Sequence, residues 1–358
     1  MFYLRLILRG FLCLLVGLCV WEVCARIDDA LTDGAPFFGS YKLESMLMTS
    51  DQFGMTGKPY AHYQRWTLNS RGNRGPEFRS DRERVICMGA SETFGLGESP
   101  DMEYPRQLER VMNARVGCDR YQVVNIAHPG QTLLNFSRRT NKVAADFRPQ
   151  IATIYPSPIF YFYGAAFDAN EVAQIKHASG LEPRVWTKVY SLLDNMPDWA
   201  EAMRYEHHIR NATRNATLVE RIPDSELERF QQDLSVLLDH LEQNHIQPVL
   251  ITHANRFGKR VLPNDRLAFL QWRNNLPMLD DPGFLDIENR ANDVVRKVAA
   301  LRNIPLVDAA GKLSGRENFV DYAHFTDRGS HIMADLIADK LLALDESQPS
   351  GCKRTSSP

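Results

Sequence analysis

Residues 85–97 read Val85-Ile86-Cys87-Met88-Gly89-Ala90-Ser91-Glu92-Thr93-Phe94-Gly95-Leu96-Gly97. The apolar residues at the start of this stretch are typical of a short strand, and a helical pattern follows from about Glu103. Ser91 therefore falls in the turn between a strand and a helix. In an open α/β sheet, ligands bind beyond the carboxyl ends of the strands, so this serine is placed where a substrate would lie.

A second stretch, near the end of the chain, offers the groups that would activate this serine. A serine hydroxyl is a weak nucleophile unless a base and an orienting group assist it, and Asp321 precedes His324 by three residues. We expect His324 to take the Ser91 proton as general base and Asp321 to hold the other ring nitrogen. The alternative is an aspartate and a histidine in an ordinary surface loop, with Ser91 as a plain turn residue or helix cap.

These motifs carry a family resemblance. With Gly89-x-Ser91, Thr93-Phe94-Gly95 and Asp321-x-x-His324 in this order, the chain resembles the SGNH/GDSL hydrolases over roughly residues 60–345. The stretch from Asn69 to Glu77 also resembles the lead-in of bacterial secreted members. The resemblance implies a triad of Ser91, His324 and Asp321 and no cofactor. The aspartate that usually follows the first glycine is Ala90 here, but it is not a triad residue.

The oxyanion that develops during serine attack needs hydrogen-bond donors. The backbone N–H of Ser91 is one candidate, and the resemblance implies a second at Gly130, although a plain turn glycine is the alternative. The family has an asparagine after its third strand, which this chain lacks. Ser157 falls near that place, and its hydroxyl is a candidate donor. Loss of one donor costs ~100- to 1000-fold in rate, so this departure puts efficient hydrolysis in doubt.

From residue 84 onward, strands alternate with helices, which is the pattern of a parallel sheet covered on both faces. We predict a three-layer αβα sandwich with a five-stranded, mainly parallel, flavodoxin-like sheet. Pro305 places the fifth strand at an edge or makes it short, and Asp327 is expected to cap the last helix. The expected strands are 84–88, 121–126, 151–155, 248–252 and 304–308, and the expected helices begin near 103, 225, 287 and 327.

The domain organisation follows from the composition along the chain. We expect a signal anchor or signal peptide over 1–25, a juxtamembrane linker and cap over 26–80, the hydrolase-like domain over 81–345, and a disordered tail over 346–358. Within the domain, residues 156–222 form an aromatic-rich insertion, which we interpret as a roof over the active site or as extra packing at the domain edge. A short edge strand is expected over 66–69.

The N-terminal segment is strongly apolar from Gly10 to Trp21, and counting from Phe2 gives the length of a membrane span. Arg5 and Arg9 predict a cytoplasmic N-terminus. The segment is interpreted as an uncleaved anchor, as a cleaved signal with its site near Ala25, or as a buried helix of a soluble protein. The first two interpretations place the body outside the cytoplasm, in the periplasm or at the cell surface.

The composition excludes some classes of partner. A net charge of -2 gives no basic field for nucleic acid. The six cysteines form no disulfide framework and no zinc-type pair, so we expect structural or incidental thiols. His207, His208 and His253 lack ligand spacing with carboxylates, so no metal site is expected.

These observations predict a membrane-tethered, exported serine esterase that acts through an acyl-enzyme. O-acetyl groups on cell-surface polysaccharide are the favoured substrate, and an acyl ester of a lipid is next. The sequence does not decide whether water or an acceptor alcohol completes the cycle. Water would make the protein an esterase, and an acceptor alcohol would make it an O-acyltransferase. The rival hypothesis is a catalytically silent SGNH-fold protein that binds glycan within an envelope assembly, which the missing asparagine favours.

Overall fold

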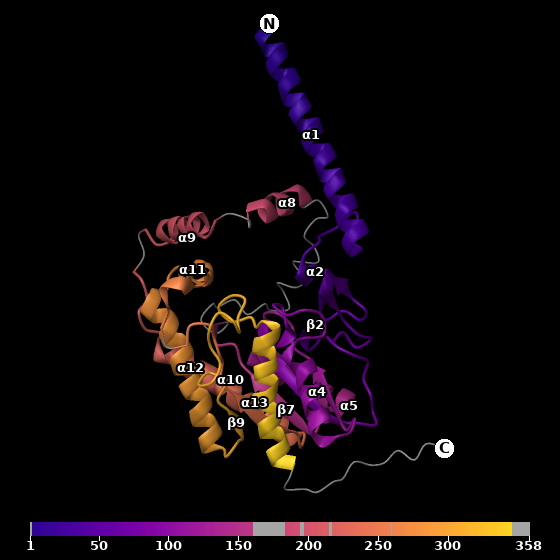
Figure 1. Cartoon of the computed structure of the whole chain (residues 1–358), viewed down its shortest axis with the longest axis vertical. Coiled ribbons are helices and arrows are strands. Elements are labelled where there is room, and N and C mark those ends of the chain that lie inside the picture. The colour runs from indigo at the N-terminus through magenta and orange to yellow at the C-terminus, as the bar shows by residue number, and fades with distance from the viewer. Residues whose placement is uncertain (1, 160–182, 194–196, 215–216, 259, 346–358) are drawn as a thin grey trace, which may run out of the picture.

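The computed structural model describes residues 2–159, 183–193, 197–214, 217–258 and 260–345. A long N-terminal helix projects from a body in which helices flank a central sheet (Figure 1). The aromatic stretch 160–163 and the predicted tail lie outside the described residues.

The central sheet has five parallel strands in the order β6-β5-β7-β8-β9. In chain order this is 2-1-3-4-5, the order of flavodoxin-like folds, so the predicted fold class is confirmed. The last strand contains two residues and lies at an edge, as the proline before it predicted. The strands are β5 (Glu83–Gly89), β6 (Tyr121–Asn125), β7 (Ile151–Tyr155), β8 (Gln247–Ile251) and β9 (Leu306–Val307).

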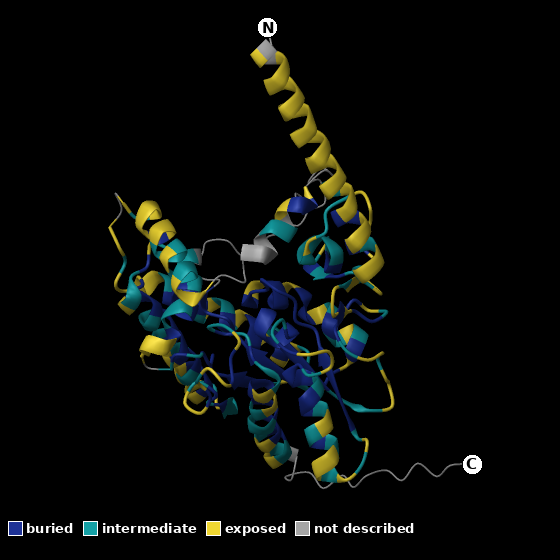
Figure 2. Ribbon diagram, turned by 45° about the horizontal axis from the view of Figure 1, so that its top comes forward, coloured by how far each residue is buried: buried dark blue, intermediate teal, exposed yellow. Residues whose placement is uncertain are grey.

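Both faces of the sheet are covered by helices, which is why β5 is a continuous apolar run. Ile86 and Met88 face one hydrophobic cluster, whereas Val85 and Cys87 face the other. Figure 2 shows the buried residues concentrated at the centre of the body. The first face is covered by α5 (Leu133–Phe147), α10 (Asp224–Gln243) and α12 (Asp281–Leu301), and the second by α4 (Tyr104–Val116) and α13 (Asp327–Asp345).

The start of one helix and the capping residue of another differ from expectation. The helix expected from residue 287 begins at Asp281, because Asp280 accepts a hydrogen bond from the backbone of Gly283 and caps it. The last helix begins at Asp327, but Thr326 caps it by accepting from the Gly329 N–H. The prediction that Asp327 is the cap is therefore wrong, and its carboxylate instead accepts from the Ser99 N–H at 2.8 Å.

The segment before the sheet is more ordered than a linker. It contains α2 (Leu43–Leu47) and two small hairpins, one of β1 (Met48–Asp51) with β2 (Gly54–Gly57) and one of β3 (His62–Tyr63) with β4 (Trp66–Thr67). The expected edge strand over 66–69 corresponds to β4. An antiparallel bridge between Arg74 and Asn125 connects this segment to the edge strand β6 of the central sheet.

Helix α1 (Phe2–Asp33) is longer than the predicted segment 1–25. Its part from Arg5 to Asp33 has a mean hydropathy of 2.1, is long and apolar enough to cross a membrane, and has none of its most apolar window buried in the body. A core helix of a soluble protein would have most of this apolar window buried. An anchor and a signal sequence both remain compatible with this geometry.

One cysteine differs from the expectation of free thiols. Cys118 is disulfide-bonded, while Cys13, Cys19, Cys24 and Cys87 are free. Cys352 lies outside the described residues. Spacing alone could not reveal this bond, because disulfide pairing is set by the fold.

Candidate active site

The proposed nucleophile lies where the connections of the sheet diverge. Strands β5 and β7 are adjacent, and Gly89 at the end of β5 is in register with Tyr155 at the end of β7. Ser91 follows β5 by two residues and Ser157 follows β7 by two. In open α/β sheets, this point between the first and third strands is where ligands bind.

Local sterics explain the sharp turn that carries Ser91. A Cβ atom on Gly89 would lie 1.9 Å from Oγ1 of Thr93 and 3.1 Å from the Tyr155 carbonyl oxygen, so only glycine fits. The one-turn helix α3 (Ser91–Phe94) follows and ends at Gly95, whose φ of 91° lies in the left-handed region. Ser91 is the first residue of this helix, so its N–H has no acceptor within the helix.

Two buried side chains hold the end of α3. Nη1 of Arg74 donates to the Phe94 carbonyl at 2.8 Å, and Nδ2 of Asn125 donates to the Thr93 carbonyl at 2.8 Å. Arg74 also forms a buried ion pair with Glu103 at 3.2 Å. The lead-in stretch 69–77, which carries Arg74, therefore braces the turn of the proposed nucleophile.

Asp321 and His324 form the hydrogen bond that their spacing predicted. Oδ2 of Asp321 lies 2.6 Å from Nδ1 of His324, and its Oδ1 accepts from the backbone N–H groups of Ala323 and His324. Burial lowers the pKa of His324, but the charge and hydrogen bond of Asp321, with Glu92 and Glu98 further away, raise this pKa to about 9. Burial also acts against ionisation of Asp321, but His324 and the two N–H donors lower its pKa overall.

The structure brings the serine turn and the histidine segment into contact. A Cβ atom on Gly97 would lie 2.3 Å from the Phe325 carbonyl oxygen and 3.3 Å from Cβ of His324. Oγ of Ser91 and Nε2 of His324 are not hydrogen-bonded in this conformation. Oγ of Ser91 instead donates to Oε2 of Glu92 at 3.4 Å, and the buried Nε2 of His324 makes no hydrogen bond with any described residue.

A buried ionic network beside Ser91 was not predicted from the sequence. His253 lies between two carboxylates, with its Nε2 3.2 Å from Oε1 of Glu92 and its Nδ1 2.8 Å from Oε2 of Glu288. Ser157 donates its hydroxyl hydrogen to the same Oε1 of Glu92 at 2.9 Å. The three ionisable side chains are each no more than 2% exposed.

Helix α12 fixes the position of His253. Asn292 accepts from the His253 N–H and donates to its carbonyl, one helical turn after Glu288. The ring of Tyr155 stacks on the imidazole with centroids 5.1 Å apart. Burial lowers the pKa of His253, but Glu288 and Glu92 raise it to about 10. The imidazolium in turn overcomes burial and lowers the pKa of Glu92, so both shifts favour an ion pair between His253 and Glu92.

The sequence did contain a signal for this network. His253 comes directly after the predicted fourth strand, and the carboxyl ends of parallel strands meet at one edge of a sheet. Metal-ligand spacing along the chain does not point to Glu92 or Glu288, because His253 and these two residues lie far apart in the sequence. Among the described residues, no group of three or more His, Cys, Asp or Glu side chains could hold a metal ion.

The proposed oxyanion donors differ in their surroundings. Gly130 is buried and has a φ of 78°, which favours glycine. The hydroxyl hydrogen of Ser157 is directed at Glu92, so in this conformation it is not available to an oxyanion. His128 is buried, and burial lowers its pKa to about 3, so its imidazole is neutral.

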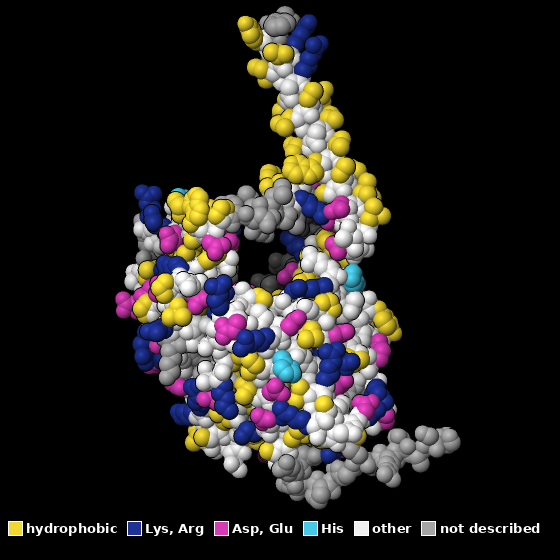
Figure 3. Space-filling model, viewed as in Figure 1, with side chains coloured by type: hydrophobic (Ala, Val, Ile, Leu, Met, Phe, Trp, Pro, Cys, Tyr) yellow, Lys and Arg dark blue, Asp and Glu magenta, His cyan; other side chains and the backbone are white. Residues whose placement is uncertain are grey.

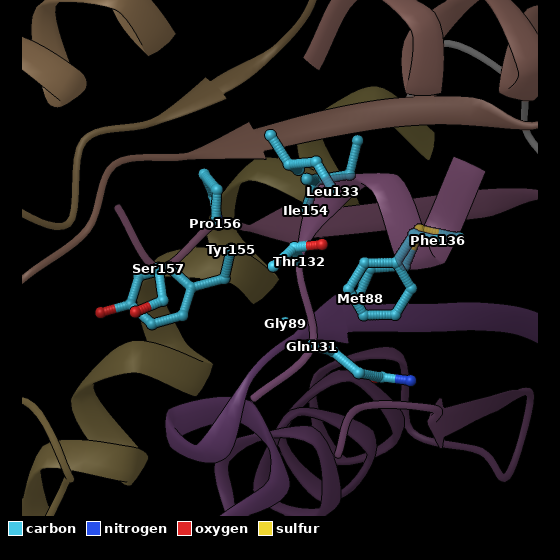
Figure 4. Close-up of a pocket in the computed structure, with 10 residues that line it drawn as sticks. All are labelled: Met88, Gly89, Gln131, Thr132, Leu133, Phe136, Ile154, Tyr155, Pro156 and Ser157. Carbon is cyan, nitrogen blue, oxygen red and sulfur yellow. The ribbon is translucent and has the colours of Figure 1, made fainter. Parts of the chain in front are cut away.

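A small cavity of about 10 Å³ lies at the same point of the sheet (Figure 4). Gly89, Ser157 and Thr132 are among the residues that line it, from the ends of β5 and β7 and the start of α5. This volume is close to what one water molecule needs.

Comparisons with known proteins gave matches among solved structures only. No protein-family model and no curated protein matches the sequence. The chain is similar to an acetyl xylan esterase (14% identity, 72% of this chain and 98% of that chain covered, TM-score 0.42). It is also similar to a lipase/acylhydrolase from Enterococcus faecalis (16% identity, 73% of this chain and 96% of that chain covered, TM-score 0.42). A third similar structure is a GDSL-like lipase from Bacteroides thetaiotaomicron (14% identity, 74% of this chain and 88% of that chain covered, TM-score 0.38).

These similarities are distant. The function of the chain is therefore inferred from its own sheet topology and side chains. The order of the strands and the Asp321–His324 pair are what the sequence resemblance implied. In these features the chain is similar to the SGNH/GDSL hydrolases.

Proposed function

We propose that the protein is a serine esterase of the SGNH/GDSL type, with Ser91 as nucleophile, His324 as general base and Asp321 as its orienting carboxylate. The observation that carries this proposal is the Asp321–His324 hydrogen bond on a segment packed against the turn of Ser91. An imidazole whose Nδ1 is held by a carboxylate presents Nε2 to a nucleophile, which is the logic of a serine triad.

Catalysis would begin with a change of hydrogen-bond partner. The Ser91 hydroxyl leaves Glu92 and donates to Nε2 of His324, which takes its proton as Oγ bonds to the ester carbonyl carbon. The N–H groups of Ser91 and Gly130 donate to the resulting oxyanion. His324 then protonates the leaving alcohol as the ester C–O bond breaks, and an acyl-serine remains. Attack by water or an acceptor alcohol, with its proton taken by His324, releases the acyl group and restores Ser91.

The substrate that we favour is an O-acetyl ester on a cell-surface polysaccharide. The cavity at the switch point is not lined by Ser91 or His324, so its volume does not distinguish a short acyl group from a long one. An ester of a lipid is the second candidate, and an acceptor alcohol in place of water would make the enzyme an O-acyltransferase.

We further propose that α1 anchors the protein in a membrane, with the body on the extracytoplasmic side. Arg5 and Arg9 at its start support a cytoplasmic N-terminus. The disulfide at Cys118 supports an oxidising compartment for the body.

The competing proposal is a catalytically silent glycan-binding protein. It is supported by the carboxylate of Glu92 near Ser91 Oγ, because a negative charge beside a developing oxyanion disfavours it. Labelling with a fluorophosphonate separates the two proposals. An active esterase is labelled and loses both label and turnover of a chromogenic acetyl ester in Ser91→Ala, whereas a silent binder shows neither label nor turnover in the wild type.

A further inference from the structure

Helix α8 (Arg184–Leu193) is attached to the end of the apolar part of α1. The N–H of Val185 donates to Oε2 of Glu22 at 2.9 Å, and Lys188 pairs with Asp28 and Asp29 at 2.7 Å. Glu22 is the first charged residue after the uncharged run Gly10–Trp21. In a membrane-anchored chain, the start of α8 therefore lies at the level where α1 leaves the hydrocarbon.

Helices α8 and α9 are oriented as helices at a membrane surface would be. Figure 1 shows α8 and α9 (Asp198–Ala212) lying crosswise to α1, on the side of the body from which α1 projects. A helix that lies crosswise to a membrane span runs along the membrane surface, as interfacial amphipathic helices do.

The side chains exposed on these helices are of the kind found at membrane interfaces. Trp186 on α8 is 57% exposed, and Trp199 and Met203, one turn apart on α9, are 69% and 63% exposed. Arg210, further along α9, is also exposed. Figure 3 shows hydrophobic side chains gathered on the upper side of α9, next to basic ones. Tryptophan is enriched at both interfaces of a bilayer, where arginine and lysine meet the headgroups.

The opposite face of α9 is occupied by protein. Helix α9 packs on α11 (Arg266–Asn275), and Nε2 of Gln271 donates to Oε1 of Glu201 across this contact at 3.2 Å. Ile209 is buried on that side. The apolar side chains Trp199 and Met203 therefore do not belong to the packing of the body.

We propose that Trp186, Trp199 and Met203 form a membrane-contact surface that seats the body on the lipid headgroup region of the bilayer that α1 spans. This inference rests on the anchor proposed above and not on the esterase activity. Figure 1 shows α13 running away from α8 and α9, so its first residue, Asp327, lies at the end of this helix that is nearer to them. The site would thus receive esters presented close to the membrane surface.

Spin-label accessibility on the full chain in phosphatidylethanolamine–phosphatidylglycerol nanodiscs tests this surface. The exposed free cysteines Cys13, Cys19 and Cys24 are first replaced by alanine. A nitroxide is then placed at Trp199→Cys or, in a second variant, Met203→Cys. We expect relaxation by oxygen to exceed relaxation by a water-soluble nickel chelate at both positions, as for a label in the interface.

Two control labels make the outcome unambiguous. Leu301→Cys places a label at an exposed apolar residue (73% exposed) at the end of α12, far from α9 in Figure 1, and should be relaxed mainly by the nickel chelate. Leu14→Cys reports the middle of α1. If the label at Leu14 lies in lipid while those at Trp199 and Met203 behave like that at Leu301, the membrane-contact surface is overturned. If the nickel chelate also relaxes the label at Leu14, α1 does not anchor the protein in the bilayer and the membrane-contact surface is overturned with it. The esterase proposal is not affected by that result.

Discussion

Nε2 of His253 lies 3.2 Å from Oε1 of Glu92, although 161 residues separate the two in the sequence. Glu92 directly follows the proposed nucleophile Ser91, so this contact places a buried, positively charged imidazole against the neighbour of that serine. With Glu288 on its other side, His253 joins the nucleophile turn after β5 to helix α12. The first two predictions concern what this network does for stability.

Replacing His253 by glutamine should strongly destabilise the fold. The variant leaves two buried carboxylates without their cation, and breaking a buried ion pair by removing one partner costs ~3–5 kcal/mol. The free energy of unfolding from urea titration at neutral pH measures this. Arg79→Ala is the control, since its pairs with Asp81 and Asp119 are solvent-exposed and such pairs contribute little to stability. Equal losses in the two variants would show that the network is not ionised.

The stability of the wild type should fall as the pH rises from about 6.5 to about 10. The folded protein holds the pKa of His253 at about 10, above the value of about 6.5 for an unperturbed histidine. A raised pKa means that the folded state binds the proton more tightly, so this stabilisation is complete below 6.5 and is lost towards 10. Urea titrations across this range should show a smaller fall in His253→Gln than in the wild type, and equal falls would contradict the assignment.

The activity of the proposed esterase should rise with pH through about 9. Only the neutral imidazole of His324 can accept the Ser91 proton, and its pKa is raised to about 9, by Asp321 first and by Glu92 more weakly. Glu92→Gln removes one of these charges, so the rising limb of kcat/KM for a chromogenic acetyl ester should move to lower pH. The wild-type profile is the reference, and a limb that stays in place would mean that Glu92 does not act on His324.

Gly97→Ala should impair activity through a steric effect alone. The new Cβ atom would meet the Phe325 carbonyl oxygen at 2.3 Å and Cβ of His324 at 3.3 Å. The histidine segment must therefore move away from the turn of Ser91, and overpacking of this kind costs ~1–3 kcal/mol. We expect a lower kcat and a lower midpoint of thermal unfolding. Gly17→Ala, which meets no atom within 4 Å, should change neither, and a wild-type kcat for Gly97→Ala would argue against a shared site.

The sheet could be predicted from the sequence because its strands are buried on both faces and read as continuous apolar runs. The position of Ser91 beyond the first strand and the Asp321–His324 spacing are likewise local signals. The start of α12 was missed because Asp280 and Pro282 signal a cap within a stretch that lacks apolar periodicity. The disulfide at Cys118 depends on which cysteines the fold brings together.

The side-chain contacts of the site could not be predicted in the same way. The sequence does not show that the Ser91 hydroxyl donates to Glu92 and leaves Nε2 of His324 without a partner. The expected donor Ser157 is directed to Glu92 for the same reason. The roles of Ser91, His324, Asp321 and Gly130 in catalysis stay predictions until variants are measured.

With α1 anchored in a membrane as proposed, the continuity of this helix limits the region in which the body can work. The helix runs without a break from the apolar segment to Asp33, and from Glu22 onward it extends ~18 Å at 1.5 Å per residue. A continuous helix to which α8 is attached, unlike a flexible tether, does not let the body sweep through the surrounding envelope. The protein would therefore search for substrate in two dimensions, at one fixed height, and esters beyond that layer would have to be carried to it.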